Sequence, residues 1–360
     1  MRGVSEPMTS DVIVLGLGPA GASAAAAAAS AGLSVIAVDR KAEAGIPVQC
    51  AEFVPAMIGQ EAGSIAASFR QPIDSMDTFL TNISVEHTPD FRGNMISRTD
   101  FDRELVARAA QAGADCRFAA PVRAIDSDGT IRLGSGETIR ARVIIGADGP
   151  RSLAGQAIGE VNRDCVESRQ ITVKLLSPHA ATDIFLSHEI AGGYGWLFPK
   201  GGTANLGLGV APQWKSSLKP LLEELHRKLV AEGRVGEEVL AYTGGLIPVG
   251  GMLDPVGQVG GIPVLLAGDA AGLANPITGA GINAAVHSGA MAGTATAAFL
   301  AGTAAALDDY RDDLEDLFGP SLRRALNKRR SLLQTYQDGG IPGPADLRAA
   351  WIAYPEYWAA

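Results

Sequence analysis

The chain has 360 residues, of which 47% are hydrophobic and 19% charged, a composition typical of a globular protein with a sizeable core. A formal net charge of −9 argues against nucleic acid as a partner, because phosphate groups would repel an acidic surface. The three cysteines and five histidines show no metal-ligand spacing, so we expect free thiols, a reducing compartment and no metal site. The first residues lack the apolar core of a signal peptide, and no apolar run is suited to crossing a bilayer. We therefore expect a cytoplasmic protein without a transmembrane segment.

The N-terminal region has the pattern of a βαβ unit. Asp11–Leu15 predicts a buried strand, Gly16–Gly21 a turn, and Ala22–Ala31 a helix. A second strand over Ser34–Val38 ends on Asp39, whose carboxylate can accept hydrogen bonds from ribose hydroxyls. In a GxGxxG turn the first glycine permits the tight turn, the second lets a pyrophosphate approach the backbone, and the third allows close helix packing. The dinucleotide contacts expected here are Gly16, Gly18, Pro19, Ala20, Gly21, Asp39 and Arg40.

The middle of the chain changes from one pattern to another. A helix over Asp100–Gly113, capped by Thr99, precedes short strands over Val122–Asp126, Thr130–Leu133 and Arg142–Ile145. From about residue 166 to 250, a series of strand-like segments predicts an antiparallel sheet. Its expected elements are strands over Gln170–Leu176, Ile184–Glu189, Tyr194–Phe198 and Ala204–Val210, and one amphipathic helix over Lys219–Glu232.

After this β-rich region the chain returns to its first pattern. Ile262–Ala267 predicts a buried strand, followed by a glycine-rich turn and a long helix of small residues, and Asp308–Thr335 predicts a charged helix. The nucleotide domain is therefore expected to be discontinuous, with a second domain inserted between its parts. The predicted boundaries are 1–70, 97–165 and 260–305 for the nucleotide domain, 71–96 and 166–259 for the substrate domain, and 306–360 for a C-terminal helical region.

The segment from Gly268 to Gly281 repeats the strand–turn–helix pattern far from the first motif. Asp269, at a strand end, can accept hydrogen bonds from a ribityl chain, and the amides of Pro276–Gly281 can face the pyrimidine end of a flavin ring. Two such elements favour FAD over NAD as the resident cofactor. The contacts expected from this segment are Gly268, Asp269, Pro276, Gly279, Ala280 and Gly281.

Two more elements lie between these motifs: Asp148-Gly149 after a strand, and Arg98 in the sequence RTDFDREL. With these motifs in this order, the chain resembles the FAD-binding family that contains the aromatic-ring hydroxylases (group A flavoprotein monooxygenases) and the geranylgeranyl reductases. The resemblance implies an α/β fold with a Rossmann-like FAD-binding domain of the GR2 or aromatic-hydroxylase type, an inserted antiparallel β-sheet substrate domain and a C-terminal helical tail. It also implies FAD contacts from Arg98, Val122, Asp148 and Gly149.

Two stretches resemble the geranylgeranyl reductase branch in particular. Pro47–Glu52 contains Cys50 where that branch places a cysteine beside the flavin, and Tyr194–Lys200 is similar to its aromatic segment along the substrate cavity. A thiol beside a reduced flavin can relay a proton, and the rings of Trp196 and Phe198 can wall an apolar cavity. Cys50 is thus expected as a flavin contact and as a catalytic residue. The alternatives are that Cys50 is a small buried hydrophobe and that the two rings are ordinary sheet core.

The sequence holds no second GxGxxG unit for a resident nicotinamide, so NAD(P)H is expected to dock transiently as the reductant. Reduced flavin can activate O2 for hydroxylation or deliver hydride to a double bond. The compact, acidic chain favours a monooxygenase acting on an apolar or aromatic substrate, including a tryptophan presented by a peptide or protein during quinone-cofactor maturation. The alternatives are a geranylgeranyl reductase-like enzyme that saturates prenyl double bonds, favoured by Cys50 and Tyr194–Lys200, and a flavin-binding protein without turnover.

Overall fold

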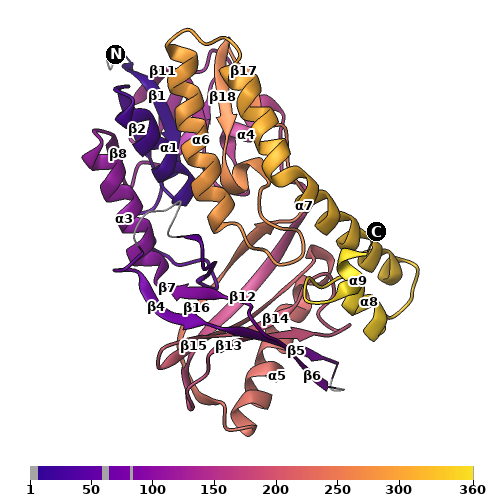
Figure 1. Cartoon of the computed structure of the whole chain (residues 1–360). Coiled ribbons are helices and arrows are strands. Elements are labelled where there is room, and N and C mark those ends of the chain that lie inside the picture. Colours follow the sequence, from indigo (N-terminus) through magenta and orange to yellow (C-terminus); the bar gives the residue numbers. More distant parts are fainter. Residues whose placement is uncertain (1–6, 59–64, 82–83, 360) are drawn as a thin grey trace.

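The computed structural model describes residues 7–58, 65–81 and 84–359, and it has two sheet-centred parts bridged by a long helix (Figure 1). One part surrounds an 8-stranded sheet and the other a 7-stranded sheet. A smaller sheet of β3 (Phe53–Pro55), β7 (Gly93–Ile96) and β4 (Phe69–Ile73) contacts both parts. The predicted fold class, α/β with an inserted sheet domain and a helical C-terminal region, is confirmed.

Parallel strands bring both glycine motifs to one edge of the 8-stranded sheet. β1 (Met8–Leu15) pairs in parallel with β2 (Val35–Val38) and with β11 (Thr138–Gly146), which pairs in parallel with β18 (Ile262–Leu266). Because the carboxyl ends of parallel strands lie together, the turns after β1 and β18 meet there. The strand order is β17–β18–β11–β1–β2–β8, with β9 and β10 beside β11. These remaining strands are β17 (Val256–Val259), β8 (Asp115–Arg117), β9 (Val122–Ile125) and β10 (Ile131–Leu133).

Helix α1 (Pro19–Ser30) begins at the first glycine turn and packs closely on α6 (Ile282–Leu300). A Cβ atom on Gly289 would lie 2.1 Å from the carbonyl oxygen of Ala20, and one on Gly293 would lie 2.4 Å from that of Ala24. The small-residue runs of the sequence therefore serve a close helix contact. None of the helices that the structure describes has the length and hydropathy needed to cross a lipid bilayer.

Helix α3 (Arg98–Gln111) differs at its start from the prediction. Its N-cap is Ser97, whose Oγ accepts a hydrogen bond from the Asp100 amide at 3.3 Å. The prediction of Thr99 as the cap was wrong, because Thr99 already lies in the first helical turn. Ser97 has the extended backbone of an N-cap, with φ −87° and ψ 112°.

The 7-stranded sheet is mixed, whereas the sequence predicted an antiparallel one. Its order is β16–β12–β15–β14–β13–β5–β6, and all neighbours are antiparallel except β13 and β5. β5 belongs to an earlier passage of the chain into this part, so no tight turn joins it to β13 and fixes their directions. The strands are β16 (Val235–Pro248), β12 (Cys165–Leu175), β15 (Thr203–Val210), β14 (Gly195–Lys200), β13 (Ala181–Leu186), β5 (Ser75–Leu80) and β6 (Ser84–Thr88).

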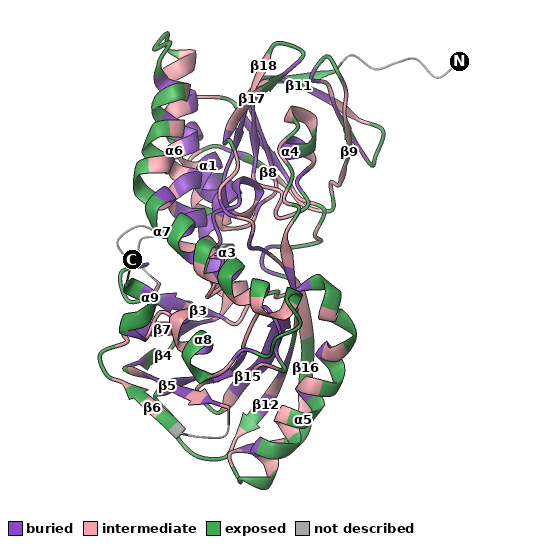
Figure 2. Cartoon of the chain, turned by 90° about the vertical axis from the view of Figure 1, so that its right-hand side faces the viewer, coloured by how far each residue is buried: buried purple, intermediate pink, exposed green. Residues whose placement is uncertain are grey.

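One helix covers a face of this sheet, and another helix bridges the two parts of the protein. α5 (Leu218–Ala231) packs on the sheet through leucines, and α7 (Ala306–Gln337) runs from the 8-stranded sheet toward α8 (Pro344–Ala349) and α9 (Pro355–Trp358) (Figure 1). The start of α7 is anchored where the Tyr310 hydroxyl donates to the Leu266 carbonyl at 2.7 Å. Figure 2 shows α7 largely exposed on its outer surface and buried toward the protein.

We expect Gly293→Val to lower the free energy of unfolding by about 1–3 kcal/mol, because the added atoms force α1 away from α6. Urea denaturation of the FAD-loaded protein, followed by circular dichroism, measures the change. Thr294→Val, at an exposed position of the same helix, is the control and should stay within about 0.5 kcal/mol of wild type. Equal stability of the two variants would contradict the close helix contact.

Candidate active site

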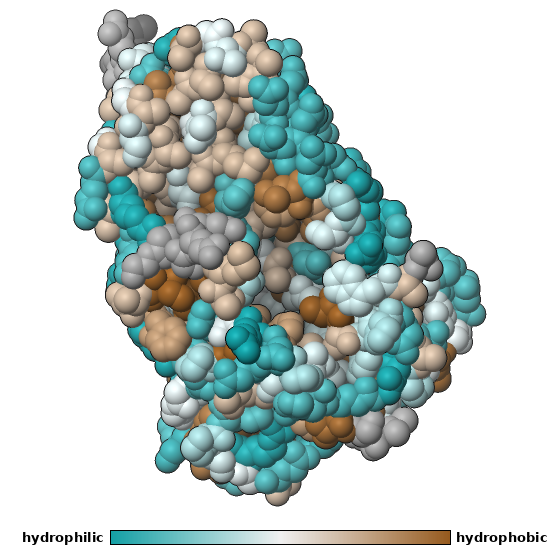
Figure 3. Space-filling view, viewed as in Figure 1, coloured by the Kyte–Doolittle hydropathy of each residue, from teal (hydrophilic) through white to brown (hydrophobic). Residues whose placement is uncertain are grey.

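A cleft of about 1860 Å³ lies between the two parts of the protein. Figure 3 shows this face hollowed between them, with apolar patches beside the hollow. Pockets for single small molecules span roughly 300–1,000 Å³, so this cleft has room for a dinucleotide and a second ligand. Its walls come from the carboxyl edge of the 8-stranded sheet, the cavity-facing side of the 7-stranded sheet, and α7.

The first glycine turn has the geometry that a pyrophosphate needs. Gly16 has φ +95°, and a Cβ atom there would lie 2.3 Å from the Ala147 carbonyl oxygen. A Cβ atom on Gly18 would meet nothing within 4 Å, so the backbone beside the start of α1 is open. The amides of that helix start and its positive dipole end favour a phosphate at this place.

Asp39 holds the turn in place at the end of β2. Its Oδ2 accepts a hydrogen bond from the Leu17 amide at 2.8 Å, and its Oδ1 accepts one from the Lys41 amide at 2.8 Å. A carboxylate oxygen can accept more than one hydrogen bond, so Asp39 can still accept ribose hydroxyls from the cleft that it lines.

Asp269 is the most unusual carboxyl group of the cleft. Burial raises the pKa of Asp269 to about 6, and the nearby Arg98 guanidinium acts against this rise. In the described part of the chain no hydrogen bond is donated to its carboxylate, which leaves both oxygens for a ligand. Gly281, the N-cap of α6, lies against it: a Cβ atom there would be 3.2 Å from Asp269 Oδ1.

All predicted cofactor residues line the cleft except Gly21 and Gly268. A Cβ atom on Gly21 would lie 1.8 Å from the Gly16 carbonyl oxygen, and one on Gly268 would lie 3.0 Å from Ala20 Cβ. These two glycines therefore serve packing behind the cleft, while the contacts of the others with FAD stay a prediction. The residues on the wall are Gly16, Gly18, Pro19, Ala20, Asp39, Arg40, Cys50, Arg98, Val122, Asp148, Gly149, Asp269, Pro276, Gly279, Ala280 and Gly281.

Asp148 has a structural task as well as a place on this wall. Its Oδ1 accepts a hydrogen bond from Ser152 Oγ at 2.5 Å, and its Oδ2 accepts one from the Leu153 amide at 2.6 Å. Burial raises the pKa of Asp148, and these donors act against the rise. The carboxylate thus fixes the start of α4 (Leu153–Ile158) beside Gly149, which has φ +83°.

Cys50 lies on the cleft wall beside a cation and a phenol. Its Sγ accepts a hydrogen bond from the Glu52 amide at 3.1 Å. Burial tends to lower the pKa of Arg98, but Asp102 and Cys50 outweigh burial and raise it. Burial, with Cys50 adding to it, also raises the pKa of Tyr194. Cys50 therefore lies beside a guanidinium that stays charged and a phenol that keeps its proton.

Glu52 is a site residue that the sequence prediction missed. It is 4% exposed and has φ +68°, in the left-handed region that residues other than glycine rarely adopt. Its carboxylate accepts hydrogen bonds from the Arg98 amide at 2.9 Å and from Asn205 Nδ2 at 2.9 Å, and it forms an ion pair with Lys200. Glu52 therefore ties the Cys50 loop to the start of α3 and to two strands of the 7-stranded sheet.

Aromatic side chains form another part of the cleft wall, called here the aromatic wall. Trp196 and Phe198 line the cleft and are 6% and 7% exposed within a buried apolar cluster. Their contact with a substrate stays a prediction. The Tyr194 ring lies 5.6 Å from Trp196 and 4.8 Å from Trp351, measured between centroids. Trp351 comes from the C-terminal tail, whose aromatic residues gave no sequence signal for a place in the cleft.

Gln170 connects the aromatic wall to the loop that carries Cys50. Gln170 Oε1 accepts a hydrogen bond from Trp196 Nε1 at 2.9 Å, and Gln170 Nε2 donates to the Cys50 carbonyl at 3.2 Å. Gln170 is 4% exposed, and both of its polar atoms are used. The indole and the thiol loop are therefore held at a fixed separation.

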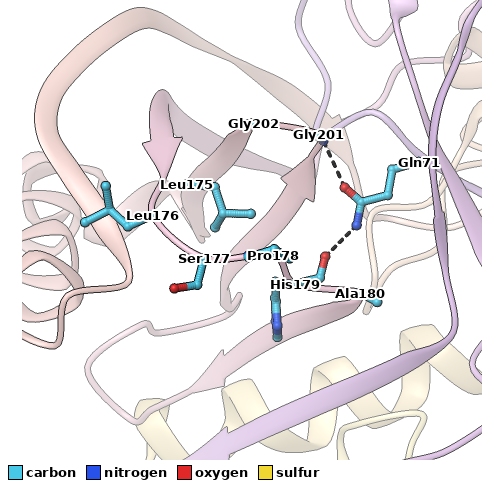
Figure 4. A pocket seen from close by; sticks show the side chains of 9 residues that line it. All are labelled: Gln71, Leu175, Leu176, Ser177, Pro178, His179, Ala180, Gly201 and Gly202. Carbon is cyan, nitrogen blue, oxygen red and sulfur yellow. Dashed lines mark hydrogen bonds between the residues drawn. The ribbon is translucent and has the colours of Figure 1, made fainter.

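A smaller pocket of about 460 Å³ lies at the end of strand β12 and beside the β14–β15 turn of the 7-stranded sheet (Figure 4). Gln71 bridges it by accepting from the Gly201 amide at 2.9 Å and donating to the His179 carbonyl at 2.5 Å. The side chains of His179, Asp77 and Asp183 lie close enough together to bind a metal ion. The sequence did not predict this cluster, because its residues come from separate segments of the chain. His179 and Arg234 already pair with the Asp183 carboxylate, so the group is an internal ion-pair cluster.

The residues of the large cleft fit FAD on three counts. Gly18 leaves the backbone open for a pyrophosphate, Asp269 has free acceptors for a ribityl chain, and the volume accepts a ring with a substrate beside it. The fold and the site thus define an FAD-dependent oxidoreductase.

Comparison with known proteins narrows this class. Residues 9–190 match the family model described as "FAD binding domain", and residues 162–247 match the "Geranylgeranyl reductase catalytic domain". The chain is 34% identical to digeranylgeranylglycerophospholipid reductase 2 of Methanopyrus kandleri over 348 residues, which covers 89% of this chain and 85% of that one. It is 31% identical to the corresponding reductase of Methanococcus aeolicus, over 79% of this chain and 75% of that one. The chain belongs to the FAD-binding family that includes these reductases.

Solved structures share the whole fold. A geranylgeranyl bacteriochlorophyll reductase-like protein of Thermoplasma acidophilum superposes with a TM-score of 0.80 at 26% identity, covering 97% of this chain and 98% of that one. PqsL of Pseudomonas aeruginosa, described as a probable FAD-dependent monooxygenase, superposes with a TM-score of 0.69 at 18% identity, covering 92% and 99%. At that identity the second likeness concerns the fold alone.

We expect FAD binding to weaken as the pH falls through about 6. Burial raises the pKa of Asp269 to about 6, so its carboxylate is ionised and accepts hydrogen bonds above this pH and is protonated below it. The dissociation constant of FAD, measured by fluorescence titration of the apoprotein, should rise about tenfold between pH 7 and pH 5. Asp269→Asn should bind more weakly at pH 7 and lose this step. Asp316→Asn, an exposed control, should keep the tenfold rise of the dissociation constant. If Asp269→Asn showed the same rise, Asp269 would be excluded as the group that causes it.

We expect Glu52→Gln to destabilise the protein by about 3 kcal/mol, because the Lys200 ammonium loses its buried partner. Chemical denaturation of the FAD-loaded protein measures the loss. Glu43→Gln removes an ion pair with Arg103 whose side chains are 54% and 50% exposed, and it should cost less than about 1 kcal/mol. A similar small loss in both variants would mean that Glu52 does not fix the loop.

Proposed function

We propose that the chain is an FAD-dependent reductase that saturates double bonds in the prenyl chains of a lipid. The observation that carries this proposal is Cys50, whose thiol lies beside Arg98 and Tyr194 on a cleft that continues along an aromatic wall. The match of residues 162–247 to the geranylgeranyl reductase catalytic domain supports it, since that range contains Tyr194–Lys200. The relatives named digeranylgeranylglycerophospholipid reductase support a prenyl-bearing glycerophospholipid as the substrate class.

Saturation of a carbon–carbon double bond adds a hydride to one carbon and a proton to the other. FAD, when bound and reduced, supplies the hydride. In this proposal Cys50 Sγ–H gives the proton to the second carbon atom, and the Arg98 guanidinium lies beside the sulfur that loses it. A proton taken from water then restores the thiol before the next turnover.

The other residues of the cleft hold the substrate and exclude water. The rings of Tyr194, Trp196 and Phe198 give an apolar chain a rigid surface and keep water from the reacting carbon atoms. Gln170 fixes the Trp196 indole relative to the Cys50 loop. These contacts orient a flexible chain, which lowers the entropic part of the barrier.

The proposed reductant is NAD(P)H, which would dock transiently because the sequence contains one GxGxxG unit. The proposed location is the cytoplasm. Cys50, Cys116 and Cys165 are all free thiols, which a reducing compartment preserves.

The aromatic hydroxylase that the sequence favoured has less support than the prenyl reductase. PqsL is 18% identical to the chain and shares its fold, while the relatives at 34% and 31% identity carry reductase names. A tryptophan presented by a peptide or protein finds no support in these comparisons. Catalytic turnover would separate the proposed reductase from a flavin-binding protein without activity.

We expect the dithionite-reduced holoprotein to add two hydrogen atoms per double bond to a geranylgeranyl lipid under anaerobic conditions, as measured by mass spectrometry. Cys50→Ser should lower this rate by about 10²–10⁴-fold, because it removes the proton donor, while FAD content stays at the wild-type level. Cys116→Ser, which changes a half-buried thiol on β8, is the control and should react at the wild-type rate. Substrate-dependent O2 uptake with an oxygenated product would instead establish the hydroxylase.

A further inference from the structure

Arg329 is a buried cation whose hydrogen-bonding capacity is mostly unused. It belongs to the inward face of α7, is 4% exposed and lines the large cleft. Its Nη1 donates a hydrogen bond to the Gly192 carbonyl oxygen. Its Nε and Nη2 atoms are buried and have no hydrogen-bond partner among the residues that the structure describes.

The nearest carboxylate does not satisfy this guanidinium. Asp164 Oδ2 lies 4.0 Å from Arg329 Nε, beyond hydrogen-bond distance, and the Asp164 side chain is 45% exposed. Burial lowers the pKa of Arg329, and Asp164 opposes this only in part. A buried guanidinium presents five N–H donors in a planar fork, and leaving them unpaired is costly.

A purely structural role would not need this residue. The link between α7 and the Gly192 carbonyl uses one donor, which a neutral side chain such as glutamine could supply. The planar fork of arginine matches the two oxygens of a phosphate or a carboxylate, and here the unpaired Nε and Nη2 atoms form such a fork.

The position of Arg329 relates this fork to the proposed substrate path. Gly192 precedes Tyr194 by two residues on the same loop, and the Tyr194 hydroxyl donates to the Thr278 carbonyl at 2.6 Å. Thr278 belongs to the segment before α6 that is expected to meet the flavin ring. An anion at Arg329 would thus lie at the same end of the 7-stranded sheet as the aromatic wall.

We propose that Arg329 binds the anionic group of the lipid substrate, a phosphate or a carboxylate, and so places the attached prenyl chain along the aromatic wall. The assignment to a substrate rests on the proposed reductase function. The anion site itself rests on the unpaired guanidinium at the cleft.

The test compares two substrates that differ in charge, geranylgeranyl phosphate and geranylgeraniol, with the reduced holoprotein. Wild type should favour the phosphate in kcat/KM. Arg329→Gln should lower the phosphate-to-alcohol ratio of kcat/KM by about 10–100-fold, as expected for the loss of one or two charge-assisted hydrogen bonds, and Arg329→Lys should fall between. Arg330→Gln, at the exposed neighbouring position, is the matched control and should keep the wild-type ratio. An unchanged ratio in Arg329→Gln would overturn the proposal.

Inhibition of the wild-type enzyme by inorganic phosphate is a second test. It distinguishes a site for the substrate head group from a separate site for free phosphate. Competitive inhibition against geranylgeranyl phosphate, without inhibition of geranylgeraniol reduction, assigns the site to the substrate head group. Equal inhibition of both substrates would indicate a separate site for free phosphate and would overturn the assignment.

Failure of the reductase function would be recognised separately. In that case wild type would reduce neither substrate. Calorimetric titration of the oxidised holoprotein with geranylgeranyl phosphate would still test the anion site, because Arg329→Gln should bind about 10–100-fold more weakly than Arg330→Gln. Equal binding by both variants would exclude Arg329 as an anion site.

Discussion

The buried carboxylate of Glu52 is the contact on which the arrangement of the cleft depends. It joins the loop that carries Cys50, the first turn of α3 and the β14–β15 pair, which come from three distant parts of the sequence. A buried charge is tolerated only where it is paired and hydrogen-bonded, so the Lys200 and Asn205 donors are required by its burial. Because the Glu52 backbone is in the left-handed region, its conformation is maintained by these contacts and not by local preference. The thiol is therefore held by tertiary structure.

The cleft combines an apolar wall with charges that are balanced in pairs. Arg98 donates to both oxygens of Asp102, at 2.9 and 3.0 Å, while its charge also reaches Cys50 and Asp269. The Arg98 guanidinium thus interacts both with Asp269, the expected ribityl contact, and with Cys50, the expected proton donor. Since the interior is less polar than water, each of these charges acts more strongly here than it would on the surface. The same reasoning makes Arg329 unusual, because its charge has no equally close partner in the described chain.

The strands and glycine turns of the nucleotide part could be predicted because their signals are local. The glycine turn, Asp39 and the Gly268–Gly281 segment each lie next to a strand, and the spacing alone places them at the edge of a parallel sheet. Contacts across the chain could not be predicted in this way. Glu52 and Lys200 are 148 residues apart, and neither residue type signals the other. The parallel pairing of β5 with β13 escaped prediction for the same reason, since it depends on how two segments meet and not on either segment's pattern.

The C-terminal region adds side chains to the cleft that lie outside the two glycine turns. The expected flavin-binding edge depends on backbone geometry at glycines and on strand order, and PqsL shares the overall fold at 18% identity. The aromatic wall depends on side chains: the tail adds Trp351 against Tyr194, and α7 adds Arg329 beside Gly192. Neither contact involves the glycine turns, so we expect both to concern the substrate and not the dinucleotide. The fold and the family match support FAD as the cofactor, whereas the proposed choice of substrate rests on the thiol, the aromatic wall and the buried cation.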